Sequence, residues 1–336
     1  MQIDGLQAVT ALNKVGNVIW PLIVVLGLAS VSVSQTTEPM DTIRVDSDLV
    51  DLKVSVIGSK SSLPLTPLQQ KDFLVLEDGL PQEITFFAAS DAPFDLVLLL
   101  DVSGSTADKM KLIRRSAKRF VDATRPNDRV AILAFTDELD LISNFSSDRQ
   151  QLKKRIDRMD KTLGGTKFWD ALRFVTEKLV PLGPISRRTA IIVMTDGVDN
   201  ALPGIYGEGS STSFPDLLRI VRDSGTLVFP IYLDTEEEEV KRHRTPRAAY
   251  QTAREQLGEL ADACGTTLYR AAKIEDLETV YDQVISDLST VYSIGYKPSN
   301  KARDGKWRSI VVQLNDHAGL FARSKRGYYA KEIRPQ

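Results

Sequence analysis

Five side chains with carboxylate or hydroxyl oxygens stand beside segments that the sequence predicts to be strands or a helix. In chain order they are Asp101, Ser103, Ser105, Thr166 and Asp196. Asp101 closes the apolar run F-D-L-V-L-L-L-D, and Asp196 closes T-A-I-I-V-M-T-D. Ligand sites in open α/β sheets lie beyond the carboxyl ends of the strands, where the winding direction reverses. If these two strands are neighbours across that point, all five side chains can face one position.

Two carboxylates and three hydroxyls form a ligand set suited to a hard cation. Mg²⁺ takes near-octahedral oxygen ligands at about 2.0–2.1 Å and usually keeps some water, and hydroxyls contribute lone pairs without charge. Because two carboxylates at most neutralise the ion, a carboxylate from outside would bind well at a remaining position. We therefore predict a Mg²⁺ site, with Mn²⁺ and Ca²⁺ as open alternatives. With one Cys and two His in the chain, an internal disulfide is impossible and a zinc site of Cys and His is nearly excluded.

The segment D-V-S-G-S is by itself a weak signal, because Asp and Ser before a helix are also ordinary N-caps. Its weight comes from Thr166 and Asp196, which follow within the same succession of strands and helices. Asp199, shortly past Asp196, is expected to be a loop residue rather than a ligand. Asp137 and Asp140 flank a hairpin and are expected to be solvated.

Strands alternate with helices between residues 94 and 288. Predicted strands cover residues 94–101, 129–135, 139–145, 189–196, 226–233 and 266–270, and the principal predicted helices cover 108–123, 168–180, 247–263 and 274–288. Continuous apolar runs are typical of buried parallel strands, and the short turn between the second and third strands predicts one antiparallel edge strand. The sequence therefore predicts an α/β fold with a doubly wound, mostly parallel sheet covered on both faces.

The flanking segments, residues 35–92 and 291–336, have β patterns instead. Each contains three predicted strands, for example L-V-D-L-K-V-S-V-I in the first and K-W-R-S-I-V-V-Q-L in the second. Three strands are too few for a core of their own. We therefore expect the two segments to pair into one small β-sandwich, with the α/β domain, residues 93–290, inserted between them.

Residues 1–34 are predicted to be a secretory signal peptide. An apolar stretch, residues 18–33, follows Lys14 and ends in small residues, so that cleavage after Ser32 or Ser34 fits the pattern. The alternative is an uncleaved anchor, since the stretch approaches the ~17 residues that span a bilayer. The proline and serines in the stretch favour cleavage. Both alternatives predict export to the periplasm, the cell envelope or the medium.

Composition limits the classes of partner. Lys and Arg total 43 against 45 Asp and Glu, a net charge of −2, which gives no support for nucleic-acid binding because such proteins carry a basic excess. A length of 336 residues favours two domains, and 42% hydrophobic residues argue against a wholly disordered chain.

The series D-x-S-x-S, then Thr, then Asp resembles the metal-ion-dependent adhesion site (MIDAS) of von Willebrand factor type A (VWFA) domains. The resemblance covers roughly residues 94–288, including the order of strands and helices. The flanking sequences D-F-L-V-L-E-D-G, I-T-F-F and G-K-W-R-S-I-V-V resemble a group of bacterial exported proteins that carry such an inserted domain. The resemblance implies that the five side chains hold the ion directly or through water, and that a Glu or Asp of a protein ligand completes its shell.

Enzyme signatures give little support to a catalytic role. The sequence lacks the phosphate-binding pattern G-x-x-x-x-G-K-[ST] and the serine-hydrolase pattern G-x-S-x-G, and Ser103 stands where aspartyl phosphatases have a second acid. We therefore expect an exported, adhesion-type protein-binding module rather than an enzyme, with membrane contact only through an uncleaved anchor. A Mg²⁺-dependent hydrolase and a structural component of an envelope assembly remain the alternatives. The Gly- and Ser-rich segment Asn200–Phe214 is either a mobile connector or a rim that selects the ligand.

Overall fold

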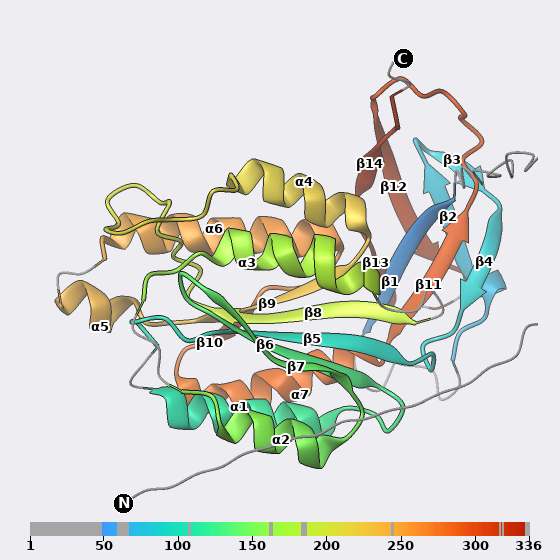
Figure 1. Ribbon diagram of the computed structural model, residues 1–336. Helices are drawn as coiled ribbons and strands as arrows, with labels where there is room; N and C mark the ends of the chain where they lie inside the picture. The colour runs from blue at the N-terminus through green and yellow to red at the C-terminus, as the bar shows by residue number, and fades with distance from the viewer. Residues whose placement is uncertain are drawn as a thin grey trace, which may run out of the picture. The chain divides into compact units, whose positions relative to one another are not determined.

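A six-stranded sheet forms the centre of the α/β part of the molecule (Figure 1). The computed structural model describes residues 49–58, 67–106, 109–160, 164–182, 187–242, 245–315, 317 and 319–332. The sheet consists, in spatial order, of β10 (Tyr269–Ala271), β9 (Leu227–Leu233), β8 (Arg188–Thr195), β5 (Phe94–Asp101), β6 (Arg129–Phe135) and β7 (Leu139–Ser146). All neighbours are parallel except β6 and β7, which are antiparallel. The predicted mostly parallel sheet with one antiparallel edge strand is confirmed.

Helices cover both faces of this sheet, as Figure 1 shows. One face packs against α1 (Met110–Ala123), α2 (Arg149–Asp157) and α7 (Leu277–Leu288). The other packs against α3 (Phe168–Phe174), α4 (Phe214–Ser224) and α6 (Arg247–Cys264). Short helical segments complete the set: η3 (Val175–Leu179) and η4 (Val180–Leu182) continue α3, α5 (Glu236–Lys241) follows β9, and η5 (Ile274–Asp276) leads into α7.

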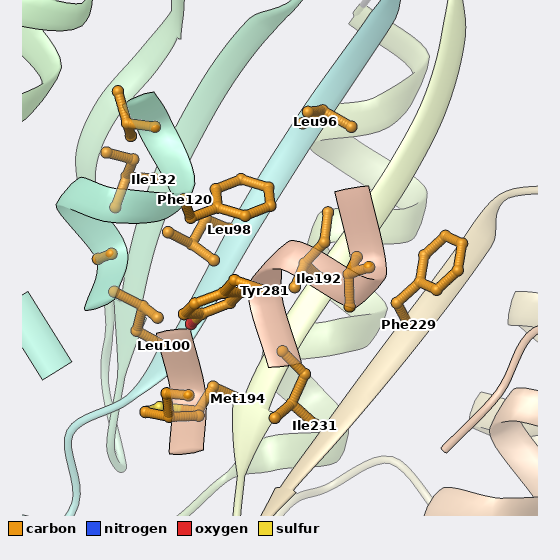
Figure 2. Close-up of a cluster of buried hydrophobic side chains, with 14 of the residues drawn as sticks. Leu96, Leu98, Leu100, Phe120, Ile132, Ile192, Met194, Phe229, Ile231 and Tyr281 are labelled. Atoms are coloured by element: carbon orange, nitrogen blue, oxygen red, sulfur yellow. The ribbon is translucent and has the colours of Figure 1, made fainter. Parts of the chain in front are cut away.

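The central strands are apolar on both faces because both are covered. Every residue of β5 is buried, Asp95 and Asp101 included. Figure 2 shows one of the two cores, where Leu96, Leu98 and Leu100 of β5 lie beneath rings from the helices. Phe120 of α1 and Tyr281 of α7 meet there, with ring centroids 5.2 Å apart. This packing holds β5 and β8 in register, so that their carboxyl ends lie next to each other.

The segments that flank the α/β part pair with each other, as expected, and form two antiparallel sheets. One has the order β13 (Leu320–Arg323), β1 (Val50–Gly58), β11 (Val291–Tyr296) and β4 (Ile84–Ala88). The other has the order β14 (Gly327–Tyr329), β12 (Trp307–Leu314), β2 (Phe73–Glu77) and β3 (Leu80–Gln82), with η1 (Gln70–Asp72) before β2. Apolar side chains of both sheets share one core. Each sheet therefore combines strands from the two ends of the described chain.

The flanking segments contribute four strands each rather than the predicted three. The additional strand on the N-terminal side, β3, arises at the D-G pair, where Asp78 and Gly79 have φ angles of 49° and 81°. Two residues with positive φ make the tight turn that suits the twist of a β-hairpin, and Glu77 pairs with Leu80 directly across it. On the C-terminal side the last predicted strand divides into β13 and β14, which pair in different sheets.

The predicted signal peptide, residues 1–34, lies outside the described residues. Across the ranges that the structure describes, no helix combines the length and the apolar character needed to cross a bilayer.

Arg188, the first residue of β8, joins the two places where the chain passes between the antiparallel sheets and the α/β sheet. Its guanidinium donates to the carbonyl of Ser90 at 2.9 Å and to those of Ala92 and Val291. It also lies 4.0 Å from the centre of the Phe94 ring. The side chain is buried, and burial lowers its pKa to about 10. The Arg188 guanidinium thus donates hydrogen bonds to carbonyls in both segments that connect the antiparallel sheets to the α/β sheet.

Replacing Arg188 by Met is expected to destabilise the protein by about 2–4 kcal/mol, because buried carbonyls lose their donor. Urea unfolding at neutral pH measures the loss. Arg219→Met is the matched control, because Arg219 pairs with Asp216 at the surface and exposed pairs contribute little. An Arg188→Met protein as stable as the control contradicts the assigned role.

Candidate metal centre

Asp101 ends β5 with its carboxylate fully buried. Its Oδ1 accepts hydrogen bonds from the backbone N–H of Ser103 at 3.0 Å and from the Ser103 hydroxyl at 2.5 Å. Its Oδ2 accepts from the hydroxyl of Thr195, the last residue of β8, at 2.6 Å. The carboxylate is therefore held between the turn after its own strand and the end of the neighbouring strand.

Asp196 lies on the neighbouring strand end, immediately after β8, and is also buried. Its Oδ2 accepts from the Ser105 hydroxyl at 2.7 Å and the Thr235 hydroxyl at 2.8 Å, and its Oδ1 accepts from Val198 N–H at 3.1 Å. The hydroxyl oxygens of Ser103 and Ser105 are 3.4 Å apart. The structure thus brings four of the five predicted residues into one chain of oxygen contacts.

Thr166 reaches this region through the loop before α3. Its backbone N–H donates to the side-chain carbonyl of Asn200 at 3.1 Å, and its carbonyl accepts from Asn200 N–H at 2.9 Å. Gly104 N–H donates to Gly164 O at 3.4 Å, so the loop lies against the Ser103–Ser105 turn. Thr166 is buried at this place, and its backbone is held by Asn200.

Sequence reasoning missed Thr195 and Thr235, which hold the two carboxylates. Thr235 follows the end of β9, is 1% exposed, and also contacts the Tyr250 hydroxyl at 3.2 Å. A signal was available, because T-L-V-F-P-I-Y-L is an apolar strand like those that end in Asp101 and Asp196, and Thr235 lies just beyond it. The two carboxylates therefore each receive a threonine hydroxyl that the motif alone does not reveal.

The two carboxylates disfavour each other's charge. Burial, and then the negative charge of Asp196, raise the pKa of Asp101 to about 7. Burial likewise raises the pKa of Asp196, and the charge of nearby Glu239 raises it further. Two buried carboxylates at short range are unfavourable when both are ionised, and a bound cation would remove this penalty.

The donor set fits a hard divalent cation. In an octahedral shell with ligands at about 2.1 Å, neighbouring ligand oxygens lie about 3.0 Å apart. The measured oxygen–oxygen distances along Asp101, Ser103, Ser105 and Asp196 run from 2.5 to 3.4 Å. Within the described ranges, no three His, Cys, Asp or Glu side chains gather as a metal site. At this place the hydroxyls of Ser103 and Ser105 stand beside the two carboxylates and would supply further oxygen ligands.

Asp199 has the contacts of a loop residue. It is fully buried, and its oxygens accept from Trp169 N–H at 3.0 Å, Ala201 N–H at 2.9 Å and both the N–H and hydroxyl of Ser210. Asp170 in α3 likewise accepts from the backbone N–H groups of Ser211 and Thr212. The Gly- and Ser-rich segment is thus fastened to the start of α3 by buried and half-buried carboxylates.

The tip of that segment is exposed. Tyr206 is 91% exposed, and its carbonyl accepts from the side-chain amide of Asn200 at 3.0 Å. Since Asn200 also holds Thr166, the segment borders the candidate centre as a rim. Asp137 and Asp140 are exposed, as expected.

The domain is a doubly wound α/β fold, and oxygen-bearing side chains gather at the carboxyl ends of its adjacent strands β5 and β8. Folds of this class bind their ligands beyond the carboxyl ends of the strands. Residues 96–198 match the family model of the von Willebrand factor type A domain, and this range contains all five candidate residues. Residues 96–198 are therefore similar to a von Willebrand factor type A domain, as the order of strands and the series of oxygen-bearing residues predict.

Comparison with individual proteins finds distant similarity. The chain is 22% identical over 253 residues to a UPF0353 protein of Nocardia farcinica (strain IFM 10152), which covers 68% of this chain and 72% of that protein. A structure of proximal thread matrix protein 1 from the mussel byssus, with a zinc-occupied MIDAS motif, gives a TM-score of 0.47 at 16% identity, over 62% of this chain and 48% of that one. BatB from Bacteroides thetaiotaomicron gives 0.42 at 17% identity, over 58% and 98%. The chain spans about half the length of the mussel protein.

The raised pKa of Asp101 predicts a pH dependence of stability in the presence of EDTA. Between pH 3.8 and about 7, the folded state keeps a proton that the unfolded state has released. The free energy of unfolding is therefore expected to fall by about 2–4 kcal/mol as the pH rises through this window. Asp101→Asn removes the titrating group and should flatten the profile, as urea unfolding at several pH values will show. An equally steep fall in the Asp101→Asn protein contradicts this assignment.

Proposed function

We propose that the chain is a metal-dependent protein-binding module of the adhesion type. In this proposal Asp101, Ser103, Ser105, Thr166 and Asp196 hold Mg²⁺, or Mn²⁺ or Ca²⁺ in its place. The observation that carries the proposal is the pair of buried carboxylates, held by hydroxyls at the ends of adjacent strands β5 and β8. The bound cation supplies a positive charge that attracts an anionic group of a partner.

The charges at the centre favour an acidic partner residue. Asp101 and Asp196 together balance the charge of a divalent ion, so the filled centre is close to neutral and accepts a further carboxylate without strong repulsion. Ser105 is partly exposed whereas Asp101 and Asp196 are buried. A ligand therefore approaches from the Ser105 side, and a protein ligand that presents Asp or Glu there completes the shell.

The proposal also covers the location of the protein and the boundaries of its domains. The signal pattern of residues 1–34 supports export to the periplasm, the cell envelope or the medium. The α/β domain would then comprise residues 93–290, and residues 35–92 and 291–336 would form the β domain that presents it.

A binding role is preferred to the hydrolase alternative. A hydrolase needs a group near the centre that moves a proton. Among the described residues, Asp101 and Asp196 would be occupied as ligands of the ion, and His317 lies 3.7 Å from Asp72 in the loop after β12, away from β5 and β8. The family match and the hydroxyl-rich centre both favour the non-enzymatic module.

Metal binding should stabilise the protein. A Mg²⁺ concentration of about 100 Kd adds about 2.7 kcal/mol to the free energy of unfolding, and the melting temperature rises accordingly. Asp101→Asn should lose this gain at pH 8, whereas Asp140→Asn, which changes an exposed carboxylate on β7, should keep it. Thermal unfolding in Mg²⁺ and in EDTA compares the three proteins. Equal stabilisation of Asp101→Asn by Mg²⁺ rules out the proposed centre.

Partner binding should require the metal and an acidic ligand. Immobilised full-length protein is expected to retain ligands from an envelope extract in Mg²⁺, to release them in EDTA and to recover them when Mg²⁺ is restored. Asp101→Ala should retain none of them, whereas Asp140→Ala should behave like the unchanged chain. Converting extract carboxylates to amides should abolish retention as well.

Retention that survives EDTA and Asp101→Ala defeats the proposed function. Circular dichroism of each variant establishes that the domain is folded, so that loss of retention reports on the centre.

A further inference from the structure

A groove with a volume of about 650 Å³ lies at the free edge of the six-stranded sheet, between β7 and the helix formed by α3 and η3. Leu133 and Leu139 line it from the strands, and Leu179 lines it from the helix. Leu141 on β7 and Phe174 on α3 are 51% and 48% exposed at its sides. Large apolar side chains thus line the groove, and two of them are half exposed to solvent.

The groove lies beside the loop that carries Thr166 of the candidate metal centre. Lys167 lies at its mouth, directly follows Thr166, and donates its backbone N–H to Thr136 O at 2.8 Å. Thr136 in turn follows Phe135, which pairs in register with Asp101. The same loop therefore borders both the centre and the groove.

Charges at the two ends of the groove differ in sign. Asp137 and Glu138 are exposed at the mouth, and their carboxylates form no ion pair within the described ranges. Lys178, at the far end, is exposed and is likewise unpaired among the described residues. Lys167 pairs with Glu208 at 3.1 Å. The groove thus runs from an acidic mouth, along apolar walls, to a basic end.

We propose that this groove docks an extended segment of the same protein partner whose acidic residue completes the metal shell. The segment carries a basic residue opposite Asp137 and Glu138, then apolar residues at alternate positions between Leu141 and Phe174, then an acidic residue near Lys178. This inference rests on the proposed function and specifies its ligand.

The dimensions suit an extended peptide. From Lys167 to Lys178 the helix rises about 17 Å, and the six residues from Leu139 to Asn144 on β7 cover a similar length. About five extended ligand residues fill this span. Asp101 is two strand spacings from β7, about 10 Å, so about three residues separate the metal-binding carboxylate from the basic residue.

The position of β7 favours an extended occupant over a helical one. β7 pairs with β6 on one side, and its other edge pairs with no strand of the described part of the chain. Free main-chain N–H and C=O groups at such an edge bind an added strand. An extended ligand can satisfy these groups while its alternate side chains enter the groove.

A random dodecapeptide display library, panned on the immobilised full chain in Mg²⁺ and eluted with EDTA, tests the inference. Enriched peptides should contain Asp or Glu, then Lys or Arg about three residues away, then alternating apolar residues. Binding of these peptides to the double variant Leu141→Asp, Phe174→Asp should weaken about tenfold or more. Phe321→Asp, at an apolar site on β13 that is 70% exposed, should leave their affinity unchanged.

A charge reversal makes the test specific. Panning on Asp137→Lys combined with Glu138→Lys should replace the enriched basic residue by an acidic one at the same spacing. Peptides that are released by EDTA but show no basic or apolar pattern, or that bind the Leu141→Asp, Phe174→Asp variant equally well, overturn the groove inference and leave the proposed function intact. Enrichment that does not depend on Mg²⁺ overturns the proposed function and the inference with it.

Discussion

The burial of Asp101 and Asp196 side by side is the constraint on which the arrangement of the site depends. Two carboxylates removed from water repel each other and lose solvation, so each must be held by donors. The protein supplies hydroxyls for this purpose from Ser103, Ser105, Thr195 and Thr235, which come from the ends of three different strands. A neutral hydroxyl can donate to a carboxylate in the free protein and offer a lone pair to a cation in the filled one. This dual capacity explains why hydroxyls, rather than Lys or Arg, surround the pair.

The sheet makes this proximity possible because of its winding. β5 lies at the centre, with β6 on one side and β8 on the other, and Leu100 pairs in register with Met194. The next residues of both strands therefore leave the sheet at the same height, where connections turn to opposite faces. Two apolar cores above and below hold the strands in register. Displacement of either strand by one residue would turn a carboxylate toward the opposite face. The geometry of the site therefore depends on the packing of the two cores.

Much of this could be predicted from the sequence, because buried parallel strands are visible as apolar runs and their ends mark the site. The strands ending in Asp101 and Asp196 were placed within one residue. The number of flanking strands was wrong, because β3 spans three residues only and β13 and β14 divide one apparent strand between two sheets. The surroundings of Thr166 could not be predicted, since they depend on Asn200, a residue from a distant loop, through backbone contacts that carry no residue pattern. Thr235 was missed for a different reason: a hydroxyl after a strand is too common to mark a site alone.

The loop before α3 lies between the candidate metal centre and the groove. Thr166 borders the candidate centre, and its neighbour Lys167 is bonded to Thr136 at the mouth of the groove. Asn200 holds Thr166 on one side and the Tyr206 carbonyl on the other, while Asp199 fastens the same segment to Trp169 at the start of α3. Hydrogen bonds of Asn200 and Asp199 therefore hold the rim to the loop before α3 and to the start of that helix. In the proposed binding mode, a ligand would not need to order these contacts, and the conformational entropy lost on binding would be largely that of the ligand. In the proposed binding mode, selectivity would reside in exposed side chains of the rim and the groove, such as Tyr206, Leu141 and Phe174.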